Sequence, residues 1–153
     1  MGSITTAFPT SAKLELATGT HNYTTTTGNV FKAALIKGTP TGTYDSTSTN
    51  YSNITGNSDE TSGTGYSAGG FAWTAAQNTT PQTTSTTAYW SWSVNPSWTV
   101  ATFNAAGCMF YNSTNSNRAV YVGSFGGTQT VTAGTFTIVL PTNDSSNAVL
   151  RLL

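Results

Sequence analysis

The glycine-rich stretch from Asp59 to Phe71 constrains the fold of this chain more than any other segment. It holds four glycines and one tyrosine between two strand-like segments. Glycine adopts positive φ at little steric cost, so glycines at this spacing fix backbone geometry and supply no chemistry. No nucleophile–base pair, metal cage or phosphate cradle lies in the neighbouring sequence. The stretch therefore predicts a tight architectural turn.

The composition favours a single all-β domain. The chain has 153 residues, the size of one domain with a sizeable core. Only 7% of the residues are charged, against roughly 25% in an ordinary soluble domain. Threonine makes up about a fifth of the chain, and β-branched residues favour strands over helices.

The charge pattern excludes several classes of partner. Five Lys and Arg balance five Asp and Glu, so the formal net charge is zero. Nucleic acids and anionic membranes need clustered basic residues, whereas those of this chain are scattered: Lys13, Lys32, Lys37, Arg118 and Arg151. No apolar run approaches the ~20 residues of a membrane span. We therefore expect no nucleic acid and no membrane as partners, and the low charge favours a chain held in an assembly.

Catalytic and metal-binding side chains are scarce. His21 is the only histidine and Cys108 the only cysteine, so a nucleophile–base pair or a transition-metal site lacks residues. We expect His21 to be exposed in a loop and Cys108 to be a small buried hydrophobe. The five acids show no paired-carboxylate motif, and Asp59, Glu60 and Asp144 lack the spacing of a calcium loop. The expectation is no enzyme, no metal and no cofactor.

Alternating apolar residues predict about eight short strands. Asn29–Lys37 is apolar at odd and even positions, which predicts a strand covered on both sides. Thr84–Val94 alternates strictly and predicts a half-buried strand. Asn112–Asn117 and Gly126–Gly127 have the composition of turns. The remaining expected strands are Gly70–Ala76, Trp98–Phe103, Ala105–Tyr111, Arg118–Phe125, Thr135–Leu140 and Ala148–Leu153. Ala12–Leu16 and Tyr51–Ile54 are compatible with two further short strands.

These strands predict an all-β fold, a single β-sandwich of the jelly-roll or immunoglobulin-like kind. At most one short helical turn is expected, in residues 95–104 after Pro96. Residues 1–20 are interpreted as a polar N-terminal arm or short edge strand, and residues 21–153 as the single β-sandwich domain. The N-terminus has neither the basic nor the apolar region of a secretion signal, so synthesis in the cytoplasm without classical export is expected.

Aromatic side chains are the remaining candidates for an interface or a ligand site, because exposed Trp and Tyr stack on sugars or anchor protein contacts. Trp90 and Trp92 share an apolar face, which favours core packing, and Trp98 is placed to close one end of the sandwich. Tyr89 lies on the serine-rich face and is expected to be the most exposed of these aromatic residues. The candidates are Tyr89, Trp98, Trp90, Trp92 and Tyr66.

Several stretches in order resemble a widespread group of small structural proteins of tailed bacteriophages. They span residues 29–153 and lie at Val30–Ile36, Glu60–Gly70, Trp98–Gly107 with Met109–Asn112, Arg118–Gly126, Val131–Pro141 and Ala148–Leu152. The group usually carries an acidic residue a few positions before the Trp of the third stretch, where this chain has Asn95. That departure puts any hydrogen bond built on the acid in doubt.

The resemblance implies a component of the phage particle. A capsid decoration (cement) protein fits best, because such proteins are small, all-β and present in many copies, often as trimers at threefold positions of the head. The implied partners are the major capsid protein and further copies of the chain, and the implied location is the phage head surface. Residues 1–20 are interpreted as an arm along a neighbour.

Two alternatives remain open. The main one is a tail-fibre or receptor-binding module that recognises host surface glycans. Exposed Trp and Tyr pairs in a shallow groove would favour that alternative, whereas a flat apolar interface would favour cement. A cellular adhesin or fibre subunit is compatible with the Thr and Asn content.

Overall fold

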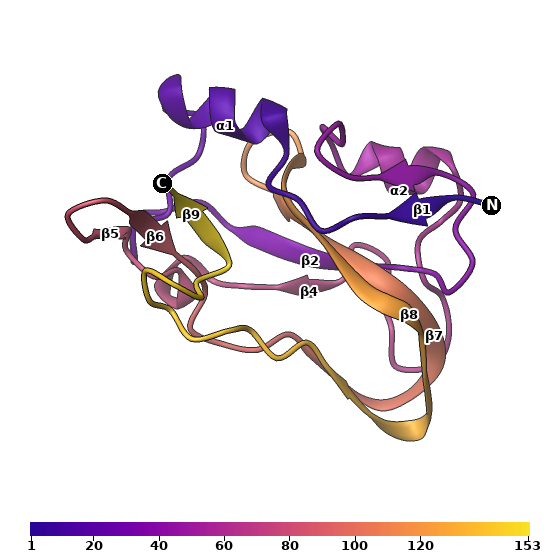
Figure 1. Ribbon diagram of the computed structural model, residues 1–153. Coiled ribbons are helices and arrows are strands. Elements are labelled where there is room, and N and C mark those ends of the chain that lie inside the picture. Colours follow the sequence, from indigo (N-terminus) through magenta and orange to yellow (C-terminus); the bar gives the residue numbers. More distant parts are fainter.

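A twisted four-stranded antiparallel sheet forms the centre of the computed structural model, which describes residues 1–153 (Figure 1). The strand order is β4-β2-β7-β8. The bounds are Phe71–Ala72 for β4, Phe31–Ile36 for β2, Ser97–Asn112 for β7 and Arg118–Thr137 for β8. The turn predicted at Asn112–Asn117 joins β7 to β8 as a hairpin. This hairpin contains the two longest strands, and its distal part extends beyond the rest of the sheet (Figure 1).

Strand β2 is covered on both sides, as its sequence predicts. Its odd-numbered residues Phe31, Ala33 and Leu35 belong to one buried cluster. Its even-numbered residues Ala34 and Ile36 belong to a second cluster on the opposite face. Successive side chains of a strand point to opposite faces, so one apolar strand supplies both cores.

Two smaller sheets complete the layers. A three-stranded sheet, β5-β6-β9, covers one end of the main sheet, and a parallel pair, β1-β3, lies near its other end (Figure 1). The larger core is rich in aromatic rings: Trp73 and Trp92 stack at 4.6 Å between ring centroids, and both meet Phe110 edge-on. The three-stranded sheet consists of β5 (Gln82–Thr83), β6 (Ala88–Trp90) and β9 (Leu150–Leu152). The parallel pair consists of β1 (Ser3–Ile4) and β3 (Thr43–Tyr44). The all-β, sandwich-like prediction is confirmed.

The prediction of at most one helical turn was wrong. The chain has two α-helices, α1 at Thr10–Ala17 and α2 at Ser52–Gly56, and a 3₁₀ turn, η1, at Ala75–Gln77. The inward face of α1 holds Ala12 and the carboxylate of Glu15, while Leu14 is 67% exposed. A buried acid and an exposed leucine hide the apolar period by which an amphipathic helix is recognised.

Residues 95–104 form no helix. Strand β7 begins at Ser97 and continues through this segment. The predicted strand at Thr84–Val94 shrinks to the three residues of β6. Its strict alternation fails beyond Trp90, because Ser91 and Trp92 are both buried.

The N-terminal residues do not form a loose arm, because they pair with β8 of their own chain. The Ala7 amide donates to the Val122 carbonyl and the Val122 amide donates to that of Ala7, both at 2.9 Å. The Ser124 amide donates to the Thr6 hydroxyl at 3.0 Å. The segment therefore covers the outer edge of β8 around Val122 and Ser124. Strand β1, which lies within this segment, is the short edge strand that the sequence predicts.

Candidate interaction surface

The tryptophans predicted as candidates lie in the core. Trp90, Trp92 and Trp98 are all at most 6% exposed. Trp98 packs against Tyr66, Phe71, Phe103 and Phe136, so it closes one end of the larger core as expected. None of the three presents a free ring face on which a sugar could stack.

Tyr66 and Tyr89 are half-buried, and Tyr89 is more exposed than any of the four tryptophans, as expected. The Tyr89 hydroxyl donates to Gln82 Oε1 on the neighbouring strand β5 at 3.0 Å. The Tyr66 hydroxyl donates to Glu60 Oε1 at 2.8 Å and accepts from the Leu35 amide at 3.0 Å. Burial and the Glu60 carboxylate raise the pKa of Tyr66 far above its ordinary value. Both hydroxyl groups therefore link neighbouring segments of the fold by hydrogen bonds.

His21 is buried, contrary to expectation. Its Nε2 lies 2.8 Å from Glu15 Oε2 and its Nδ1 lies 2.9 Å from Asn112 Nδ2.

Cys108 is buried as predicted, and burial raises the pKa of its thiol to about 12. No group of three or more His, Cys, Asp or Glu side chains lies together as metal ligands. No helix is long and apolar enough to cross a membrane.

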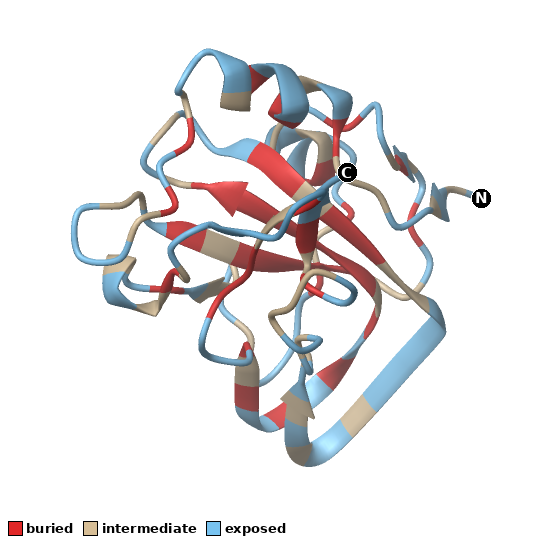
Figure 2. Ribbon diagram, turned by 60° about the vertical axis from the view of Figure 1, so that its left-hand side comes forward, coloured by how far each residue is buried: buried red, intermediate tan, exposed pale blue.

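The surface that remains is the distal β7–β8 arm, which we define as residues 97–105 and 125–139. Its two strands pair from Ser97 with Thr137 to Ala105 with Gln129. Figure 2 shows exposed residues along much of this projecting hairpin. Strand β8 is the outermost strand of the main sheet, and no bridge covers its outer edge beyond Ser124.

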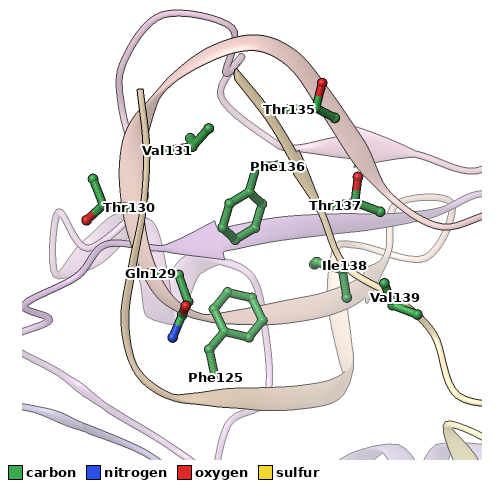
Figure 3. Close-up of a pocket in the computed structure, with 9 residues that line it drawn as sticks. All are labelled: Phe125, Gln129, Thr130, Val131, Thr135, Phe136, Thr137, Ile138 and Val139. Atoms are coloured by element: carbon green, nitrogen blue, oxygen red, sulfur yellow. The ribbon is translucent and has the colours of Figure 1, made fainter. Parts of the chain in front are cut away.

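The arm bends sharply on itself. Val100 has φ +50° and Ala133 has φ +47°, and the register shifts on both sides of Ala101. Positive φ is rare for alanine and strained for a β-branched valine. The bend brings the end of β8 back over its own earlier part, so that residues 135–139 face residues 125–131 (Figure 3).

An apolar groove of about 540 Å³ lies within this bend. The rings of Phe125 and Phe136 form its floor, with centroids 5.9 Å apart (Figure 3). Val131 and Ile138 are half-buried in its walls, and Val139 is 75% exposed at its edge. Val100, at the bend, is 72% exposed. Exposed apolar surface gathered in a hollow is typical of an interaction site.

The arm carries no charge. No Asp, Glu, Lys, Arg or His lies between Glu60 and Arg118, or between Arg118 and Asp144. Soluble proteins commonly protect a sheet edge with Lys, Pro or an inward-pointing charge. The outer edge of β8 in the arm has no such charge, and the bend interrupts it. The sequence carried this signal in its charge-free stretches, but a count of total charge conceals where the charges are missing.

The glycine-rich turn supports the bend. The Thr102 amide donates to the Thr64 carbonyl at 2.9 Å, where the turn crosses β7. A Cβ on Gly65 would lie 2.9 Å from the Cα of Ala101, and one on Gly63 would clash with the Thr102 carbonyl oxygen. The glycines therefore allow two backbones to touch, which is the architectural role that their spacing indicates.

Asn95, where the resemblance predicts an acid, makes a hydrogen bond of its own. Asn95 Oδ1 accepts from the Leu140 amide at 3.0 Å, and the Pro96 carbonyl accepts from the Ile138 amide at 2.9 Å. These two bonds fix the segment that forms one wall of the groove.

The chain matches no protein-family model, and no similar curated protein or solved structure was found. The resemblance to phage structural proteins therefore stays a prediction.

Proposed function

We propose that this protein is a structural component of a tailed-phage virion, a capsid decoration protein that binds the assembled head and bridges capsomers. The observation that carries the proposal is the charge-free arm with its apolar groove and uncovered strand edge. A neutral surface of this kind contacts another protein without desolvating charges, and its strand edge and threonines supply hydrogen bonds.

The proposed mechanism is mass action. A ligand that binds the expanded shell, and neither the unexpanded shell nor free subunits, stabilises the expanded state. Each copy contributes a modest free energy, which the copy number multiplies. In this proposal the major capsid protein occupies the groove, and the chain works on the head surface as a homo-oligomer, for which a trimer matches a threefold position.

The glycan-binding alternative is less well supported. It needs exposed aromatic faces in a shallow groove, and the candidate tryptophans are buried. The phenyl rings of the arm pack against each other and against the core instead of standing as a flat platform. We propose no catalytic step, since His21, the only histidine, is enclosed by protein.

Co-sedimentation tests the proposal. Purified protein is mixed with expanded and with unexpanded undecorated capsids of the phage that encodes it. Saturable binding to expanded shells, with a higher disassembly temperature, is the expected result. Binding to neither shell, together with retention on a glycan array, would move the function to the tail.

A further inference from the structure

A buried hydrogen-bond chain joins helix α1 to the β7–β8 hairpin. Glu15, on α1, receives Arg118 Nη1 of β8 at 2.6 Å on Oε1 and His21 Nε2 at 2.8 Å on Oε2. The His21 side chain is completely buried, and Asn112 at the end of β7 is fully buried too. This hydrogen-bond chain joins the N-terminal part of the protein to β7 and β8, with His21 and Asn112 separated by 91 residues and Glu15 and Arg118 by 103.

The orientation of Asn112 is fixed by its backbone neighbours. Its Oδ1 accepts from the amides of Thr114 and Asn115, both at 3.1 Å. Its Nδ2 must therefore point the other way, toward Asn29 Oδ1 at 2.8 Å and His21 Nδ1 at 2.9 Å. An amide nitrogen only donates, so His21 Nδ1 is the acceptor in this pair.

This arrangement assigns the proton of His21. Nδ1 accepts from Asn112, so the single ring proton of the neutral imidazole sits on Nε2 and is donated to Glu15. A second proton would have to sit on Nδ1, where it would face the Asn112 N–H donor. Asn112 cannot turn its oxygen toward it without breaking the bonds from Thr114 and Asn115.

All groups that face His21 are accounted for. Glu15 from α1 favours the imidazolium and Arg118 from β8 disfavours it, while Asn112 from β7 carries no charge but presents an N–H donor to Nδ1. The rings of Tyr23 and Phe31 pack at 6.1 and 6.4 Å between centroids. Burial is the largest effect and outweighs Glu15, so the pKa of His21 lies below its ordinary value.

We propose that Glu15, His21 and Asn112 form an acid-sensitive latch: it holds α1 and the following loop on the sheet while His21 is neutral, and it opens when His21 takes up a second proton. The folded state binds that proton less readily than the open state. The latch is therefore closed above the ordinary histidine pKa, and it weakens as the pH falls through about 6.5.

Opening uncovers aromatic surface. Leu16 of α1 packs against the larger core and lines a hollow of about 510 Å³ together with His21, Tyr23 and Trp90. Tyr23 and Trp90 are each only 3% exposed while the helix is in place. The latch thus controls access to rings that are inaccessible at neutral pH, independently of any partner of the arm.

Hydrogen exchange at single amides tests the latch. The reporters are Thr18 and Thr20, whose amides donate to the Leu14 and Glu15 carbonyls. The matched variant is His21→Gln, whose amide can donate to Glu15 and accept from Asn112 but takes up no proton. Glu15 is present in both proteins, so their comparison at one pH isolates His21.

The expected protection of Thr20 is equal in the two proteins at about pH 7.5. As the pH falls below about 6.5 the wild type is expected to lose protection relative to the variant, by a factor that grows as the pH falls. The Ala7 and Val122 amides serve as references and should keep equal protection. A wild-type to variant ratio that does not change with pH, or references that lose protection in parallel, would overturn the latch.

Imidazole ¹⁵N shifts of the wild type give a second test that does not depend on the variant. The expected spectrum at neutral pH is that of the Nε2–H tautomer, and protonation of Nδ1 should coincide with the loss of Thr20 protection. A neutral Nδ1–H tautomer would contradict the assignment.

Discussion

At the scale of single residues, Gly70 is the position where a methyl group does the most damage. Its φ is +75°, and a Cβ there would clash with the backbone of Ala33 in β2. Gly126 has nearly the same φ, +76°, but nothing lies within 4 Å of the added atom. We expect Gly70→Ala to cost about 3 kcal/mol and Gly126→Ala about 1 kcal/mol in urea unfolding. Equal costs would show that φ alone matters.

Asp59 is a second single residue on which the stability of the fold depends. Burial alone would raise the pKa of its carboxyl, but hydrogen bonds from Tyr44, Gly42, Lys37 and Thr41 outweigh burial and hold the pKa far below the ordinary value. Both carboxylate oxygens accept: Oδ2 from the Tyr44 hydroxyl at 2.6 Å and the Gly42 amide at 2.7 Å, and Oδ1 from Lys37 Nζ at 2.9 Å.

We therefore expect Asp59→Asn to destabilise the fold by about 3 kcal/mol at neutral pH, because an amide turns one donor toward other donors. A depressed pKa gives stability that is present above the pKa of the unfolded state, about 4, and is lost as the pH falls below it. The wild type should show this decline in denaturant titrations and the variant should lack the Asp59 part of it. An identical acid slope in both proteins would refute the role of Asp59.

At the scale of elements, the bend in the arm stores strain. Val100 holds φ +50° at an exposed corner of β7, and Asn adopts this region more readily than a β-branched residue. We expect Val100→Asn to stabilise the protein by about 1 kcal/mol in thermal or urea unfolding. Val94→Asn, at an exposed valine outside the arm, is the control and should give no gain. A loss of stability at position 100 would mean that the bend depends on valine contacts.

The helices, strands and turns differ in how well the sequence predicts them. Strand β2 and the β7–β8 turn were predictable, because local alternation and turn residues determine them. Helix α1 was not, because its inward position 15 is an acid whose partners, His21 and Arg118, become neighbours only in the fold. The bend was hidden for the same reason: no local rule places positive φ at Val100 or Ala133.

The candidate surface was only partly predictable. Aromatic residues attracted attention because they dominate interfaces, yet in this chain Trp90, Trp92 and Trp98 are needed to fill a core that has few aliphatic side chains. The arm offers phenylalanines and valines in a charge-free segment, and only the doubling back of β8 collects them into one groove.

At the scale of the whole molecule, the two proposed devices lie at opposite sides (Figure 1). The arm projects from one end of the main sheet, and α1 with its latch lies across the other side. A partner on the arm therefore leaves α1 free to respond to acid. The separation also means that a failure of one proposal does not decide the other.

The most direct test of the central claim compares two lysine variants in the capsid co-sedimentation assay. Val139→Lys places a charge at the edge of the groove, and Leu14→Lys places one on α1 at a residue of similar exposure. Both side chains are mostly exposed, so both variants should keep the wild-type melting temperature. We predict that Val139→Lys weakens binding to expanded capsids at least about tenfold and Leu14→Lys by less than about twofold. Wild-type affinity in Val139→Lys would contradict the claim that the arm is the binding surface.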